Sequence, residues 1–96
     1  MLNNVVVVGR IFEIKEIGES SVLVTLATPR YFKNEFGEYD TDYIDVLLRG
    51  SVAKNTLEYC KKGDLIGAKG RIENLKDSLI PAIVGEKISY LKQGGE

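Results

Sequence analysis

Aromatic and cationic side chains are interleaved in one segment of the chain, between Arg30 and Tyr43. Residues 31–33 read Tyr-Phe-Lys, and two further rings follow at Phe36 and Tyr39. This segment is too aromatic for an ordinary solvated loop and too polar for a protein core. A single-stranded nucleic acid offers bases that stack on aromatic faces and phosphates that require positive charge. The residue types therefore predict a surface that binds such a strand by stacking and by charge.

Both flanks of this segment show the period of two that a half-buried strand requires. Apolar side chains alternate over residues 22–28 and again over residues 43–49. If the face that carries Ile44 packs in the core, the next face presents Tyr43 to the outside. We therefore expect a hairpin whose polar tip, residues 34–38, projects from the fold as an arm.

The sequence supports a stacking role more strongly for some of these rings than for others. Tyr43 is a stacking candidate because the alternation turns it outward. Tyr31, Phe36 and Tyr39 either stack on bases or pack along the arm or against a neighbouring subunit. We keep Tyr31 and Phe36 as stacking candidates.

Six cations are candidates for phosphate contacts, since Arg and Lys neutralise a nucleic-acid backbone. They are Arg10, Arg30, Lys33, Arg49, Lys69 and Arg71. Each has a simpler alternative. Arg10 could be a solvated arginine after a bulge at Gly9, and Arg30 and Lys33 could be solubilising charges. Lys69 and Arg71 could protect an edge strand from aggregation.

The remaining strands also follow from periodicity. Residues 5–8 are four valines, which indicates a strand that is buried on both faces or forms a subunit contact. A turn at residues 18–20 should join the first two strands as a hairpin. A fourth strand is expected over residues 64–73, a turn over residues 74–78 and a last strand over residues 79–91.

One short helix is expected after the second hairpin. Ser51 is the predicted N-cap, and Ala53, Leu57 and Cys60 form an apolar stripe at helical spacing. Lysines 61 and 62 should occupy the last turn, and Gly63 should end the helix in the left-handed conformation.

Composition excludes most kinds of catalysis. The chain has 96 residues, a net charge of −1, one cysteine and no histidine. Without histidine there is no Ser-His or Cys-His nucleophile pair, and Cys60 is expected in the core. We predict no enzymatic activity and no cofactor. The chain carries neither an apolar run long enough to cross a membrane nor a signal peptide, so we expect one cytoplasmic domain.

Four acidic residues near the arm suggest a competing hypothesis. Glu38, Asp40, Asp42 and Asp45 could bind Mg²⁺ in a nuclease or phosphotransfer site. Their spacing is not that of a calcium loop, which needs a central glycine and a closing glutamate. We interpret them as turn and surface residues and predict no metal site.

Several motifs occur in a defined order along the chain. They are Val-Gly-Arg at residues 8–10, Thr-Leu-Ala at 25–27, rings at Phe32 and Tyr43, and Lys-Lys-Gly at 61–63. In this order and spacing, from Leu2 to about Leu91, the chain resembles the bacterial and phage single-stranded-DNA-binding protein family. The resemblance implies an all-β fold, a five-stranded antiparallel Greek-key barrel of the OB type with one short helix between strands three and four. The barrel would occupy residues 1–92, and residues 93–96 would form a short disordered C-terminus.

The resemblance also implies function. Bases would stack on Phe32 and Tyr43, and a homo-oligomer, a tetramer or a dimer, would bind and protect single-stranded DNA without sequence preference in the cytoplasm, at the nucleoid. Two departures matter. Cellular members carry a long tail with an acidic tip that recruits replication enzymes, whereas this sequence ends at Glu96 without one, so recruitment by that route is not expected. The chain also has no tryptophan, and Arg49 or Leu48 lies near a position that is often aromatic in the family.

The alternative is an interaction module of the same fold, such as a primosome-type adaptor whose groove binds protein. The balanced charge and the missing tail favour it. Salt dependence separates the two functions, because binding to a polyanion weakens with salt.

Overall fold

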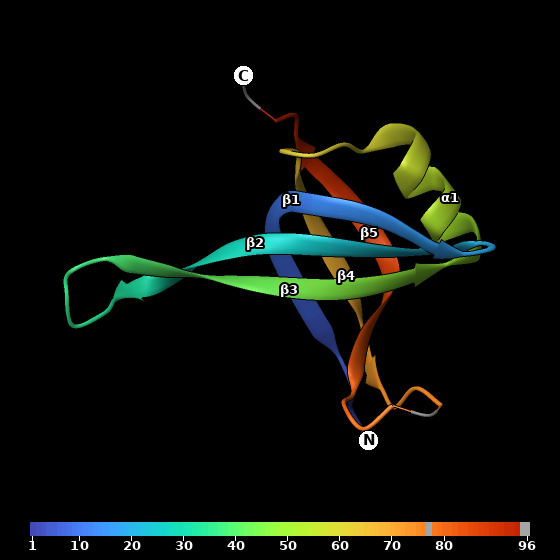
Figure 1. Cartoon of the computed structure of the whole chain (residues 1–96), viewed down its shortest axis with the longest axis horizontal. Coiled ribbons are helices and arrows are strands. Elements are labelled where there is room, and N and C mark those ends of the chain that lie inside the picture. The colour runs from blue at the N-terminus through green and yellow to red at the C-terminus, as the bar shows by residue number, and fades with distance from the viewer. Residues whose placement is uncertain (77, 95–96) are drawn as a thin grey trace.

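The structure, a computed structural model, describes residues 1–76 and 78–94. These residues form a closed five-stranded barrel with one helix (Figure 1). In chain order the elements are β1 (Val5–Gly18), β2 (Ser21–Lys33), β3 (Tyr39–Arg49), α1 (Gly50–Tyr59), β4 (Leu65–Glu73) and β5 (Ala82–Lys92). The order around the barrel is β1-β2-β3-β5-β4, which confirms the predicted OB architecture. β3 and β5 pair in parallel, and the other neighbours pair antiparallel.

Strand alternation builds the core as the sequence predicted. Val24 and Leu26 of β2 and Leu48 of β3 have no exposed surface, and Ile66 of β4 is equally buried. Their neighbours along each strand face outward or lie half-buried. Burial of these apolar side chains is the main stabilising contribution to the barrel.

β1 pairs with two neighbouring strands of the barrel, and it changes partner at Arg10. The first half of the strand pairs with β4 and the second half with β2, while Arg10 is paired with both Leu65 and Ala27. Gly9 is required for this close approach, because a Cβ there would lie 2.6 Å from Thr28 Oγ1. The bulge itself falls at Phe12, beyond the predicted position.

The four valines of β1 are not buried on both faces of the single chain. Val7 points into the core, whereas Val6 is 69% exposed and Val8 is 46% exposed. The first of the two readings of this run is therefore wrong for the barrel alone, and a subunit contact stays a prediction.

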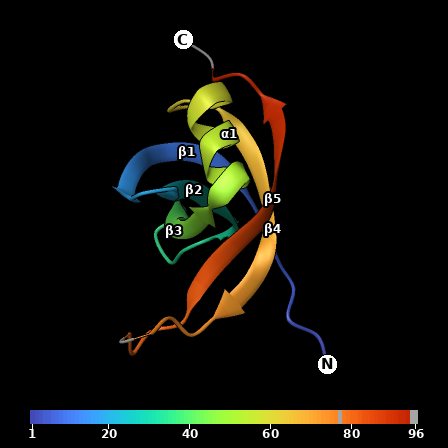
Figure 2. The same ribbon diagram turned by 90° about the vertical axis from the view of Figure 1, so that its right-hand side faces the viewer.

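The helix begins and ends earlier than predicted. Arg49 is its N-cap residue, and Arg49 makes no side-chain capping hydrogen bond, so Ser51 lies inside the first turn. The helix ends at Tyr59, and lysines 61 and 62 form the following turn with Gly63, whose φ is +94°. The buried face consists of Ala53 and Thr56 instead of the stripe through Leu57. In Figures 1 and 2, α1 covers the end of the barrel opposite the β2–β3 arm.

Two predicted segments extend to residues that the structure leaves undescribed. The expected turn over residues 74–78 contains residue 77, which lies outside the described residues, and β5 begins only after Pro81. At the C-terminus, residues 95 and 96 also lie outside them. The Gly94 N–H donates a 2.8 Å hydrogen bond to the buried Asp64 carboxylate, and the disorder expected of residues 93–96 stays a prediction.

Within residues 1–76 and 78–94, no helix has the length and apolar character needed to cross a membrane.

Candidate nucleic-acid interface

The β2–β3 arm extends beyond the barrel and is held by polar contacts at two levels (Figure 1). At the tip, the Asn34 Oδ1 accepts hydrogen bonds from the N–H groups of Phe36 and Glu38, at 2.8 and 3.0 Å. At the base, Arg30 donates to both carboxylate oxygens of Asp42, at 3.1 and 2.9 Å. An asparagine turn and a two-pronged arginine pair both restrict the backbone. The arm is therefore a defined platform instead of a loose loop.

Four aromatic side chains lie on this arm, and all four are exposed. Tyr31 is 92% exposed and meets Phe32 edge-to-face, with 5.3 Å between ring centroids. Phe36 lies at the tip, and Tyr39 lies below the Lys33 ammonium, which is 5.7 Å from the ring centroid. Tyr39 thus has a partner within the arm, as its simpler reading predicted. Tyr31, Phe32 and Phe36 keep free aromatic faces that could accept bases.

Tyr43 lies nearer the barrel and faces outward, as predicted. It is 59% exposed and shares a row with Ala27 and Arg10, since Ala27 is paired with both. Its ring contacts Phe12 of β1 in a T-shaped arrangement, with 4.9 Å between centroids. Phe12 is not among the candidates predicted from the sequence, because it lies in an apolar run with Ile11 and Ile14 whose spacing does not fit a period of two.

Three of the candidate cations keep their charge available. Arg10 donates a 3.1 Å hydrogen bond to the Gly63 carbonyl, Lys33 lies over Tyr39, and Lys69 is exposed. In the described part of the chain, none of the three forms an ion pair with a carboxylate.

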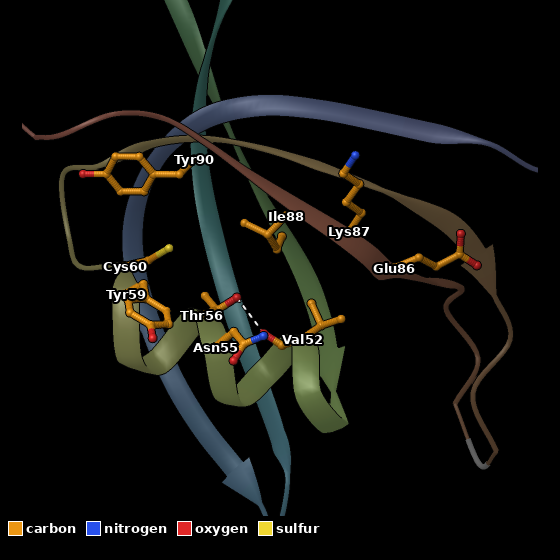
Figure 3. A pocket seen from close by; sticks show the side chains of 9 residues that line it. All are labelled: Val52, Asn55, Thr56, Tyr59, Cys60, Glu86, Lys87, Ile88 and Tyr90. Carbon is orange, nitrogen blue, oxygen red and sulfur yellow. Dashed lines mark hydrogen bonds between the residues drawn. The ribbon is translucent and has the colours of Figure 1, made fainter.

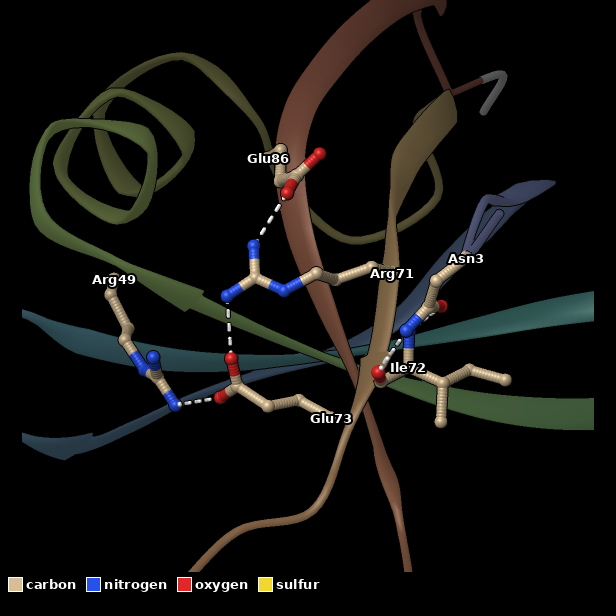
Figure 4. A network of polar contacts seen from close by, with 6 residues as sticks. All are labelled: Asn3, Arg49, Arg71, Ile72, Glu73 and Glu86. Atoms are coloured by element: carbon tan, nitrogen blue, oxygen red, sulfur yellow. Dashed lines mark hydrogen bonds and ion pairs between the residues drawn. The ribbon is translucent and has the colours of Figure 1, made fainter. Parts of the chain in front are cut away.

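The other three candidates are paired with carboxylates. Arg30 binds Asp42, and the pKa of that carboxyl lies below its usual value, chiefly because Arg30 donates hydrogen bonds to it. Arg71 lies between Glu73 and Glu86, while Arg49 donates to Glu73 at 3.0 Å (Figure 4). The hydrogen bonds from Arg71 and then Arg49 lower the pKa of Glu73. Each arginine would have to exchange a carboxylate for a phosphate in order to contact a nucleic acid.

Position also separates Lys69 from the rings. Lys69 is paired with Val6 of β1 and Lys87 of β5, so it belongs to the outer face of the β1–β4–β5 sheet. Tyr43 belongs to the outer face of β1, β2 and β3. The structure thus brings Arg10 together with Tyr43, and Lys33 with the arm rings, but places Lys69 on another side.

A groove runs beside Tyr43. It has a volume of about 500 Å³ and is lined by the outer face of β2–β3 and by the β4–β5 connection, including Leu47, Ile80 and Pro81. Leu47 lies two residues after Asp45 on the outward row that also carries Tyr43, yet only 8% of it is exposed. Such an apolar groove fits the unstacked bases of a single strand.

A second groove separates α1 from β5 and has a different character. It has a volume of about 350 Å³, and Cys60 and Tyr90 lie at one end of it (Figure 3). Burial, and then the charge of Asp64, raises the pKa of the Cys60 thiol, so the thiol stays protonated at neutral pH. This agrees with a packing role for Cys60.

Three of the four acidic residues considered for a metal site, Asp40, Asp42 and Asp45, have partners in the protein. Asp40 accepts a 3.0 Å hydrogen bond from Asn34, Asp42 binds Arg30, and Asp45 accepts a 2.6 Å hydrogen bond from Thr25 on a separate row. Among the described residues, no group of three or more carboxylate or cysteine side chains is placed to hold a metal ion.

Comparison with known proteins adds sequence and structural relatives. Residues 2–78 match the single-strand binding protein family. The single-stranded DNA-binding protein B of Bacillus subtilis is 41% identical over 78 residues, which are 76% of this chain and 69% of that protein. The single-stranded DNA-binding protein of Streptococcus pneumoniae is 44% identical over 78 residues, and this chain spans 50% of its length.

Solved structures agree in fold. A small single-stranded DNA-binding protein from Mycoplasma pneumoniae superimposes with a TM-score of 0.65 at 27% identity, covering 92% of this chain and 85% of that chain. The Plasmodium falciparum SSB in complex with ssDNA superimposes with a TM-score of 0.72, covering 96% of both chains. At 19% identity, the second likeness concerns the fold alone.

Proposed function

The chain belongs to the single-strand binding protein family, and from this premise we propose that it binds and protects single-stranded DNA without sequence preference in replication, recombination or repair. The family consists of DNA-binding proteins without enzymatic activity.

The observation that carries the proposal is the set of exposed rings on the arm and on the adjoining outer face of the barrel. Phe32 and Tyr31 project from the arm, Phe36 lies at its tip, and Tyr43 continues the series on the barrel. Each ring is at least half exposed, and stacking of bases on such rings tolerates any sequence. A protein core would bury these side chains, so their exposure needs another explanation.

Phosphate contacts would come first from the cations that have no carboxylate partner among the described residues. Arg10 lies in the Tyr43 row, and Lys33 lies on the arm. Arg30, Arg49 and Arg71 are ion-paired and would contribute only after a carboxylate is displaced. When a phosphate replaces a carboxylate beside an arginine, the net charge of the interface changes little. The affinity of this protein for a nucleic acid should therefore depend only moderately on salt concentration.

Assembly would use the outer face of the β1–β4–β5 sheet. Val6 and Val8 are exposed there. Gly67 lies between the side chains of Val8 and Leu91, since a Cβ added to it would be 3.7 Å from Val8 Cγ2 and 3.8 Å from Leu91 Cδ1. We propose a homo-oligomer through this face, a tetramer in preference to a dimer. Light scattering should give a multiple of the chain mass, and Val6→Asp should reduce it. A wild-type monomer at micromolar concentration would refute this assembly.

The ion-paired arginines favour a second candidate, the adaptor that binds protein. In that case the arginine–carboxylate pairs would be permanent surface structure, and the groove beside Tyr43 would hold a peptide. Binding to a nucleic acid would then be weak or absent.

A salt titration tests the proposal. Anisotropy of a fluorescent oligo-dT is measured with increasing protein at several salt concentrations, beside the same strand annealed into a duplex. The proposed function predicts binding to the single strand, weakened by salt, and much weaker binding to the duplex. Equal affinity for both, or no binding to either, would favour the adaptor.

A further inference from the structure

Phe12 of β1 lies at the centre of a second group of rings and cations, on the barrel itself. Its ring is 49% exposed and contacts Tyr43 at a centroid distance of 4.9 Å and an interplanar angle of 63°. The Lys62 ammonium, from the turn after α1, lies 6.0 Å from the Phe12 centroid. An exposed ring beside a second ring and a cation has the features that single-stranded nucleic acids use.

Alternation from Val7 through Ile11 turns the Phe12 ring outward, and a bulge in β1 keeps the next residue outside as well. Ile11 is paired with Leu26 and Glu13 with Thr25, so Phe12 is the extra residue between two pairs. Ile11 points into the core and is 2% exposed, and Ile14 packs against the core again. Two consecutive residues, Phe12 and Glu13, therefore lie on the outer side, as a bulge permits. Regular alternation would have returned Glu13 to the core.

The charges on either side of the ring pair have opposite sign. Arg10 lies in the row of Tyr43, and Lys62 lies over Phe12. The next row, about 7 Å along the strands, contains Glu13 and Asp45 paired across Thr25. A strand that stacks on the rings would therefore have its phosphates on the Arg10 side and away from the carboxylates.

We propose that Phe12 is a base-stacking residue, which forms with Tyr43 a two-ring platform on the barrel, flanked on the phosphate side by Arg10 and Lys62. The inference rests on the proposed function and extends it. The strand would continue from the arm across Tyr43 and Phe12 to the turn of residues 61–63. Phe12 would thus compensate in part for the small number of large rings in a chain without tryptophan.

Tryptophan fluorescence gives a direct test, because the natural chain contains no tryptophan. Phe12→Trp introduces one fluorophore at the platform. Tyr59→Trp introduces one on α1, where the native ring is 70% exposed and contributes to the α1–β5 groove. Oligo-dT is added to each variant until anisotropy of a labelled strand shows saturation. A base stacked on residue 12 quenches the Phe12→Trp emission strongly, and Tyr59→Trp emission stays nearly unchanged.

Affinity supplies the second readout. Phe12→Leu keeps an apolar side chain and removes the aromatic face, so its dissociation constant for oligo-dT should rise about five-fold or more. Tyr59→Leu is the matched control and should bind as the wild type does. Thermal unfolding of all four variants shows whether each one folds, and Phe12→Trp keeps the test open if Phe12→Leu does not.

The outcomes separate the two proposals. If the wild type binds oligo-dT but Phe12→Trp is not quenched, or Phe12→Leu binds with wild-type affinity, the role of Phe12 is refuted and the proposed function stands. If the wild type does not bind oligo-dT, the proposed function fails and this inference fails with it.

Discussion

Replacing Asp42 with asparagine removes the nearer of the two carboxylates that pair with Arg30 and leaves the side-chain shape almost unchanged, while Asp40 stays 3.9 Å from the guanidinium. In the native protein both Asp42 carboxylate oxygens accept from Arg30, at 3.1 and 2.9 Å. Arg10, Lys33 and Lys62 have no carboxylate partner among the described residues and lie near the rings. Three phosphate contacts to a single strand give a slope of log affinity against log salt of about −2, and a fourth gives about −2.8.

The assay follows from these slopes. Between 50 and 200 mM salt the wild type should lose affinity for oligo-dT about 20-fold, and Asp42→Asn about 50-fold. The variant should also bind more tightly than the wild type at the lower salt concentration. Glu58→Gln is the matched control, because Glu58 is an exposed carboxylate on α1 and forms no ion pair in the described part of the chain. An unchanged slope in a folded Asp42→Asn protein would refute the reasoning that Arg30 becomes a phosphate ligand when freed.

Three further predictions concern stability and stacking. Gly9→Ala should lower the free energy of unfolding by about 2 kcal/mol, measured with urea, because its Cβ would lie 2.6 Å from Thr28 Oγ1; equal stability would contradict the close approach. Asp64 has a folded-state pKa below its usual value, first because the Gly94 N–H bonds to it, so it stabilises the fold above its unfolded pKa and this contribution is lost as the pH falls through the folded pKa. Urea unfolding from pH 7 to pH 3 should show a smaller acid loss in Asp64→Asn than in the wild type, and equal losses would contradict that role. Phe32→Leu should weaken oligo-dT binding about five-fold or more by anisotropy, and an unchanged affinity would remove Phe32 from the interface.

Much of the barrel could be predicted from the sequence, because alternation is a local signal. Val24 and Leu26 point inward and Tyr43 outward as their spacing required. The bulge at Phe12 escaped prediction, since an extra residue in one strand is visible only when its partner strand is in place. Phe12 was not among the stacking candidates, although its ring is half exposed.

The partners of the candidate cations could not be predicted from the sequence either. The sequence gives their residue types, but which carboxylate each one meets depends on the register between strands. Arg30 meets Asp42 across the arm, twelve residues later, and Glu73 meets Arg49 only because β3 and β4 end near each other in the barrel. Helix capping also failed for a long-range reason. Gly50, with φ of +62°, donates its N–H to the Ser20 carbonyl of the β1–β2 turn, and the helix begins there before Ser51 can cap it.

The central claim is that exposed rings hold single-stranded DNA. It is tested most directly by anisotropy of labelled oligo-dT at 0.5 M salt, where charge contacts are largely screened, with the wild type and with the Phe32→Ala/Tyr43→Ala double variant. The account predicts that the wild type still binds and that the double variant loses affinity by about 30-fold or more. Equal affinity of the two folded proteins would contradict it.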